Sequence, residues 1–121
     1  MNWQGRTFVP SLVCPGVEFV IARMSFGRRL ELMKRVRELA TRAEFFEAGC
    51  DARNHMEASL LGGEMDRLYL EWGLEEIRGL ELDGAPATPL SLTERGPEAL
   101  FREALDAVRA ECGLNEDERK N

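Results

Sequence analysis

The chain has 121 residues, of which 44% are hydrophobic and 31% charged, so it fits one compact domain and excludes a disordered composition. No apolar run approaches the roughly 20 residues that span a bilayer, and the start MNWQGRTFVP lacks signal-peptide features, so we expect a cytoplasmic protein. The net charge of −6 is uneven, because residues 1–42 carry eight Lys and Arg against three Glu, whereas residues 43–121 carry eight against nineteen acidic residues. Such asymmetry bears on partners rather than on fold.

Residues 5–24 are predicted to form a β-hairpin. After the turn signal Pro15-Gly16, apolar residues alternate with other residues, which predicts a strand with one apolar face. The alternating residues are Val17, Phe19 and Ile21. The partner strand is expected around Thr7–Val13, where Pro10 confines it to a sheet edge.

Residues 26–48 are predicted to form a long amphipathic helix, with Ser25 as its N-cap and Gly49 as its C-cap. Apolar residues recur every three or four positions, as a buried helix face requires. They are Leu32, Val36, Leu39, Ala43 and Phe46. Glu31–Arg35 and Glu38–Arg42 have the spacing of stabilising ion pairs.

A second long helix is predicted from Asp51, its N-cap, to about Trp72, with Gly73 ending it. Its apolar stripe is Ala58, Leu61, Met65, Leu68 and Trp72. Gly62-Gly63 lies in the middle, where each glycine costs roughly 1 kcal/mol relative to alanine. Either another backbone approaches closely at this pair or the helix bends there.

The remainder is predicted to be extended over residues 77–89, with a turn at Asp83-Gly84, and then helical. Thr88 is placed to cap a short helix over residues 89–95. A last helix begins with Pro97 in its first turn and stops at Gly113. Its apolar residues are Leu100, Ala104, Ala107, Val108 and Cys112. Residues 114–121 read as a charged tail.

The predicted fold class is mainly α, within the α+β class. It comprises a short N-terminal β-hairpin, a long antiparallel helix pair, a short extended segment and a C-terminal helix. We expect one domain over residues 1–121, in which residues 5–24 form the hairpin, 25–113 the helical core and 114–121 the tail.

Groups that would perform catalysis or hold a cofactor are not evident, so we expect no enzyme, no cofactor and no metal site. The cysteines Cys14, Cys50 and Cys112 are odd in number and far apart, which favours reduced thiols over disulfides or zinc. The single histidine, His55, lies near a loop-to-helix junction, where a surface or capping role is usual. No phosphate-binding loop, nucleophile elbow or zinc-protease motif occurs.

Acidic residues are frequent along and after the second helix, and they are interpreted as a solvated acidic face. They are Glu64, Asp66, Glu71, Glu75 and Glu76. Metal-binding clusters usually combine carboxylates with histidine or place them in a calcium loop, and neither pattern is present.

The first long helix carries a basic run. It consists of Arg28, Arg29, Lys34, Arg35, Arg37 and Arg42. The neighbouring residues are not the Asn, Gln or Ser that read bases, and the acidic chain would repel a phosphate backbone, so we do not expect nucleic-acid binding. The apolar face of this helix is needed for a core, which argues against a membrane surface. The basic face is expected to meet the chain's own acidic helix, a second copy or an acidic protein partner.

Three stretches resemble the small tail assembly chaperones of tailed bacteriophages and prophages. They are FVIARMSFGRRLELMKRVREL, LYLEWGLEEIRGLELDGAPATP and GPEALFREALDAVRAECGLNEDERKN, which cover most of residues 17–121. The resemblance implies a non-enzymatic protein of the host bacterial cytoplasm that is absent from the mature virion. Its implied partners are the tape measure protein, which it keeps soluble, and the tail tube protein. A homo-oligomer and a frameshifted, extended form are left open.

Two other functions remain as alternatives: a structural virion component, such as a tail terminator or connector accessory, and a DNA-binding regulator. For the chaperone reading, the candidate partner-binding residues combine exposed cations with apolar residues that suit helix-in-groove recognition. They are Arg28, Arg35, Arg42, Leu60, Leu61, Met65 and Trp72.

Overall fold

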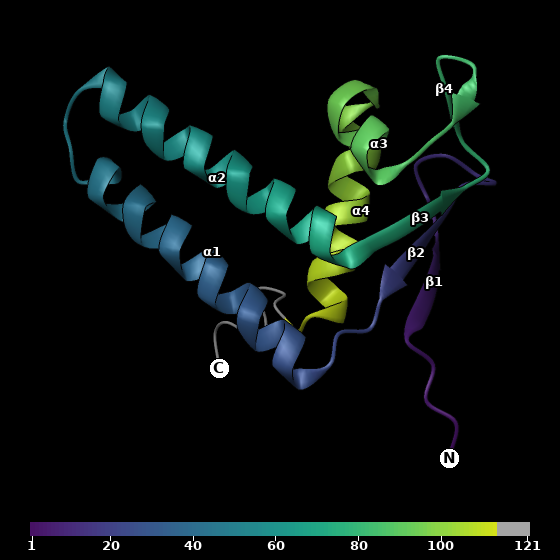
Figure 1. Ribbon diagram of the computed structural model, residues 1–121. Helices are drawn as coiled ribbons and strands as arrows, with labels where there is room; N and C mark the ends of the chain where they lie inside the picture. The colour runs from purple at the N-terminus through teal and green to yellow at the C-terminus, as the bar shows by residue number, and fades with distance from the viewer. Residues whose placement is uncertain (114–121) are drawn as a thin grey trace.

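The computed structural model describes residues 1–113, which form a small body with one long helical hairpin projecting from it (Figure 1). The chain order is β1 (Arg6–Pro10), β2 (Glu18–Ala22), α1 (Phe26–Glu47), α2 (Ala52–Gly73), β3 (Leu74–Arg78), β4 (Glu81–Leu82), β5 (Ala85–Pro86), α3 (Pro89–Arg95) and α4 (Glu98–Glu111). The antiparallel pair α1–α2 and the predicted α+β class are both confirmed. The predicted tail, residues 114–121, lies outside the described residues.

The main sheet has the strand order β1-β2-β3, with both pairings antiparallel. The predicted hairpin is confirmed, and β1, with Pro10 at its end, is an edge strand as expected. The sequence predicted one buried face for β2, but the strand is buried on both faces, because Val20 is buried together with Phe19 and Ile21. Val20 is paired with Phe8 on one strand and Glu76 on the other, and the side chains of directly opposite residues lie on the same face, so they flank Val20 there.

Strand β3 follows α2 without a loop and was only partly predicted, because the extended segment was expected to begin at residue 77. A register shift between Val20 and Ile21 opposite β3 places one extra residue in this strand. Leu74 and Ile77 therefore both point into the core although they are three residues apart. The helical core predicted for residues 25–113 thus contains a strand that completes the N-terminal sheet.

Local hydrogen bonds explain where the long helices begin. The Ser25 hydroxyl accepts a hydrogen bond from the Arg28 amide at 3.2 Å, and the Asp51 carboxylate accepts one from the Asn54 amide at 2.8 Å, as predicted. Helix α1 ends at the C-cap Ala48, one residue before the predicted Gly49. Glycine is needed at position 49 for another reason, since an added Cβ would lie 2.0 Å from Asn54 Nδ2.

The glycines of α2 have contrasting surroundings. Gly62 and Gly63 lie within an unbroken helix, and an added Cβ at either would meet nothing within 4 Å, so the expected close approach of another backbone is absent from residues 1–113. Gly73, by contrast, faces α4 so closely that an added Cβ would lie 2.3 Å from Val108 Cγ1. The close helix packing therefore occurs at the end of α2 rather than at its middle.

The turns and caps of the last third of the chain agree with the prediction except at Pro97, which is the N-cap of α4 rather than a residue of its first turn. Asp83 and Gly84 have φ values of 53° and 81° and join β4 to β5. Thr88 and Ser91 form a reciprocal capping box at the start of α3. Helix α4 ends at Glu111, and Gly113 has the left-handed φ of 74° that suits glycine just after a helix.

One hydrophobic core lies where the inner face of the sheet, the C-terminal half of α2, the start of α1 and α3–α4 meet. Its largest fully buried side chains are Phe19, Ile21, Leu32, Leu70, Leu92 and Leu105. Along α1 only Leu32 and Ala43 are buried, since the part of the hairpin that projects from the body has no third layer to cover it (Figure 1).

Candidate protein-binding surface

Two grooves run along α2 at the level of Gly62 and Gly63. The α3-side groove, about 610 Å³, lies between α2, α3 and α4, and its apolar lining residues are Leu60, Leu92 and Phe101. The α1-side groove, about 720 Å³, lies between α1, α2 and α4, and its apolar lining residues include Val36, Ala40 and Met65. Both grooves share the lining residues Ser59, Gly63, Asp66 and Arg102, so they adjoin one another along α2.

A polar bridge lies between the two grooves and connects α2 to α4. Asp66 accepts hydrogen bonds from Arg102 Nη1 at 2.8 Å and from Arg109 Nη2 at 2.7 Å, and its side chain is only 17% exposed. The interpretation of Asp66 as part of a solvated acidic face is therefore wrong. The lining of the α1-side groove, with Asp66, Arg102 and Arg109, therefore has one positive charge in excess. The α3-side groove also contains Glu64, Arg67 and Glu98, and its lining has one negative charge in excess.

Trp72 holds two of the predicted cations in place. The guanidinium of Arg28 lies 4.1 Å from the centre of its ring and that of Arg35 lies 5.3 Å away, both within cation–π range. Arg35 also pairs with Glu31 at 3.8 Å, as the i,i+4 spacing predicted. The tryptophan is half-buried against the core, so it stabilises the base of the hairpin while its cations remain exposed.

The remaining sequence candidates are divided between surface and interior. Leu60 is 59% exposed at the α3-side groove, and Met65 is half-buried at the α1-side groove. Leu61 is only 3% exposed and packs in the interior, so it cannot contact a partner on a folded surface. Arg42 is exposed and forms no ion pair within residues 1–113, so the predicted Glu38–Arg42 pair does not form.

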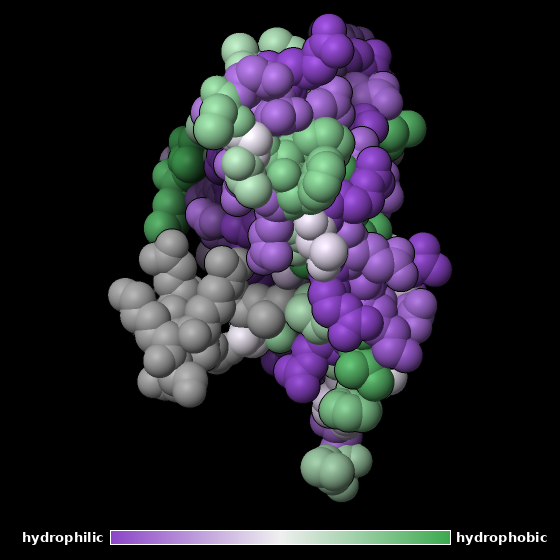
Figure 2. Space-filling view, turned by 90° about the vertical axis from the view of Figure 1, so that its left-hand side faces the viewer, coloured by the Kyte–Doolittle hydropathy of each residue, from purple (hydrophilic) through white to green (hydrophobic). Residues whose placement is uncertain are grey.

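The free end of the hairpin exposes an apolar patch that the sequence analysis did not single out. Phe45 and Met56 are 75% and 64% exposed, and Phe45 packs edge-on against Phe46 with ring centres 5.4 Å apart. Figure 2 looks onto this end and shows apolar surface surrounded by hydrophilic residues. His55 is exposed here, in agreement with its expected surface role.

Glu103 of α4 fastens the β1–β2 loop. Its carboxylate accepts hydrogen bonds from the Ser11 hydroxyl, from the Leu12 amide at 2.7 Å and from the Val13 amide at 3.3 Å. Desolvation by burial acts to raise the pKa of Glu103, but these three hydrogen bonds outweigh it and hold the pKa below its ordinary value. The loop is thereby held with Leu12 90% exposed.

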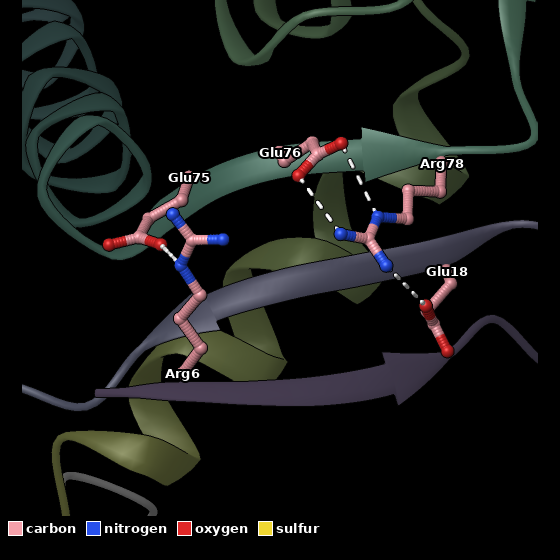
Figure 3. A network of polar contacts seen from close by, with 5 residues as sticks. All are labelled: Arg6, Glu18, Glu75, Glu76 and Arg78. Atoms are coloured by element: carbon pink, nitrogen blue, oxygen red, sulfur yellow. Dashed lines mark hydrogen bonds and ion pairs between the residues drawn. The ribbon is translucent and has the colours of Figure 1, made fainter. Parts of the chain in front are cut away.

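The outer face of the sheet is covered by ion pairs (Figure 3). Arg6 Nε lies 2.9 Å from Glu75, while Arg78 reaches Glu76 at 3.3 Å and Glu18 at 3.9 Å. These groups are about half exposed, so each pair stabilises the fold only weakly. Two guanidiniums and three carboxylates share this face across three strands, so their charges nearly cancel and leave one negative charge in excess. Glu75 and Glu76 thus belong to β3 rather than to the acidic face predicted along α2.

The cysteines are free thiols in different environments, Cys14 half-buried, Cys50 exposed and Cys112 buried. Desolvation by burial raises the pKa of the Cys112 thiol, which lies 3.8 Å from Met24 Sδ, so this thiol is a poor nucleophile. Within residues 1–113, no three His, Cys, Asp or Glu side chains gather in a way that would hold a metal ion.

No family model matches the chain, and no curated protein or solved structure matches it either. Over the described part of the chain, no helix is long and apolar enough to cross a membrane. The roles of Asp66, Glu103 and Phe45 became evident only from the structure. The first two act through partners far away in sequence, which no local pattern reveals.

Proposed function

We propose that this protein is a non-enzymatic tail assembly chaperone of a bacteriophage or prophage, which binds the tape measure protein and assists assembly of the tail tube. The resemblance of three stretches within residues 17–121 supports the family. The tape measure protein of that family is long and helical, so the proposal requires a surface that accepts a helix.

The observation that carries the proposal is the pair of grooves along α2. Between them, an incoming backbone can approach Gly62 and Gly63 closely, because no side chain occupies the space above either residue. Apolar residues on both sides, with Leu60 exposed at the rim, supply the contacts that helix-in-groove recognition uses. In the α1-side groove, Arg102 and Arg109 face the single carboxylate of Asp66, and the one positive charge in excess favours an acidic side chain of the partner.

The first test is co-expression with the long, helix-rich protein expected to be encoded nearby. We expect that protein to be soluble and to co-purify only when this chain is present. If it stays soluble alone and never co-purifies, the chaperone proposal is wrong. Recovery of this chain in purified particles would instead make it a virion component.

The second test places a leucine in the grooves. Gly63→Leu fills space that both grooves share, and we expect it to weaken co-purification at least tenfold without unfolding the chain. Ala110→Leu adds the same side chain to an exposed position of α4 that lines neither groove, and it serves as the matched control. Equal binding by the two variants would show that the grooves are not the binding site.

A further inference from the structure

Helix α1 presents a second surface to solvent, on the side opposite α2. Six exposed residues recur along it at spacings of four, four, three, four and four, which places them on one helix face. They are Phe26, Leu30, Lys34, Arg37, Thr41 and Phe45, and we call them the outer face of α1. At about 100° per residue, the outer face is centred roughly 160° from the stripe of Leu32, Val36, Leu39 and Ala43.

The outer face is apolar at its ends and basic at its middle. Phe26, Leu30 and Phe45 are 73%, 46% and 75% exposed. Within residues 1–113, α2 is the only element that packs extensively against α1, so nothing described covers these side chains (Figure 1). None of the six residues lines either groove of α2, so this surface is separate from the one in the proposed function.

Most cations of α1 lack a carboxylate partner, unlike the arginines in the rest of the described chain. Outside α1, every described arginine except Arg53 has a carboxylate partner within 4.0 Å. On α1 only Arg35 has one. Lys34 and Arg37 therefore have no carboxylate within 4.0 Å among the described residues, although Glu38 lies one turn after Lys34 and Glu44 lies on the same side of the helix, toward Phe45.

We propose that the outer face of α1 binds an amphipathic helix of a partner protein, with acidic side chains at its middle and apolar side chains toward both ends. Helices pack through rows of residues spaced by three and four, as these six are. The face extends from residue 26 to residue 45, about 28 Å, which matches a partner helix of roughly 20 residues.

Charge excludes a second copy as the occupant. If two outer faces met, in either orientation, Lys34 and Arg37 of one copy would lie against the same two cations of the other. Like charges placed opposite one another are destabilising, whereas acidic residues at that place are attracted.

The same face suits nucleic acid and membranes less well than a helix. Three large apolar side chains gain nothing from a phosphate backbone, and the acidic chain as a whole repels one. A membrane-surface helix needs a continuous apolar face, but here Lys34, Arg37 and Thr41 separate Leu30 from Phe45.

The test uses two synthetic helical peptides of about 20 residues, identical except at the centre. Both carry leucines toward their ends, and the centre holds two glutamates in one and two lysines in the other. Binding to the full chain is measured by fluorescence anisotropy. We expect the acidic peptide to bind at least tenfold more tightly than the basic one, and its affinity to fall as salt is raised.

A charge exchange makes the test specific. In the variant Lys34→Glu with Arg37→Glu, we expect the acidic peptide to bind at least tenfold more weakly and the basic peptide to bind more tightly. Arg53→Glu, at another exposed cation without a carboxylate partner, is the matched control and is expected to leave both affinities unchanged. Because both substituted positions are exposed, circular dichroism should show unchanged folding.

Several results would overturn the proposal. They are equal affinity for the two peptides, no effect of the charge exchange, and dimerisation of the wild-type chain that the exchange abolishes. The proposal would also be overturned if anionic lipid vesicles or a DNA duplex bound to the wild-type chain and lost binding after the charge exchange, because the occupant would then be another kind of molecule. Tighter peptide binding after removal of residues 114–121 would make the chain's own acidic end the occupant.

Discussion

Single residues of the same type have different roles here because their partners differ. Asp51 accepts a hydrogen bond from an amide three residues away, and this was predicted because cap and partner are neighbours in sequence. Asp66 binds Arg102 and Arg109, which are 36 and 43 residues away, so the sequence showed only another acidic residue on a helix. Side chains whose partners are local can be predicted from one sequence, whereas long-range pairs require the fold.

Glu103 makes the stability of the protein depend on pH. Its folded-state pKa lies below the ordinary value of 4.5, so the ionised carboxylate stabilises the fold above that pH. This contribution is lost as the pH falls through the folded-state pKa. Glu103→Gln should therefore lower the free energy of unfolding by about 1 kcal/mol at pH 7, and the difference should shrink below about pH 4.5.

Urea unfolding at pH 7 and pH 3.5 checks the role of Glu103. Asp106→Asn, an exposed carboxylate of the same helix without a described partner, is the control and should change stability little. A Glu103→Gln effect that is as large at pH 3.5 as at pH 7 would contradict the charge-assisted hydrogen bonds.

Trp72 and Arg28 should be energetically coupled. Because Arg28 is exposed, its interaction with the ring is expected to contribute about 0.5 kcal/mol. A double-mutant cycle with Trp72→Leu and Arg28→Ala, followed by chemical unfolding, measures this coupling. A coupling energy of zero would mean that the ring and the guanidinium are near one another without stabilising contact.

At the scale of elements, periodicity predicted the long helices well but failed for β3. Apolar residues recur every three or four positions along α1 and α2 because each helix packs one stripe of side chains against the other. In β3 the residue inserted at the register shift separates Leu74 from Ile77 by three positions, so the period of two that identifies a strand is lost. The glycines within α2 were noticed from the sequence, but only the packing distinguishes those that face open space from the one that faces α4.

Alanine substitutions of these glycines should change stability in opposite directions. Gly73→Ala is expected to lower the free energy of unfolding by about 1–3 kcal/mol, because its Cβ would overlap Val108. Gly62→Ala should raise it by about 0.5–1 kcal/mol, because the helix gains propensity and the space is open. Thermal and urea unfolding of both variants measure this, and destabilisation by Gly62→Ala would show that its surroundings are not open.

For the whole molecule, the short connection between α1 and α2 predicted their antiparallel pairing. The sequence could not predict that the free end of this hairpin projects beyond the body, because this depends on where α4 and the sheet pack against α2 (Figure 1). The grooves along α2 have the same origin, since α3 and α4 cover only its C-terminal part. The candidate partner-binding residues Leu60 and Met65 line these grooves, and their role in binding stays a prediction. The burial of Leu61 depends on tertiary packing.

Stability should be unevenly distributed over the molecule. Backbone amides of residues 43–58, at the free end of the hairpin, are expected to exchange with solvent at least about tenfold faster than those of residues 100–108 in α4. The physical reason is that the free end has a single packing partner, whereas α4 lies against the sheet and α2. Hydrogen exchange followed by mass spectrometry tests this, and equal protection of both segments would contradict it.

The position of β1 at the edge of the sheet has a consequence for storage at high concentration. Unpaired edges can act as templates for further strands and so start fibrils. Here Pro10 lacks a backbone N–H and Arg6 brings a charge to the opposite end of a strand only five residues long. The β1 edge should therefore resist pairing with the sheet of another copy, even when the protein is crowded.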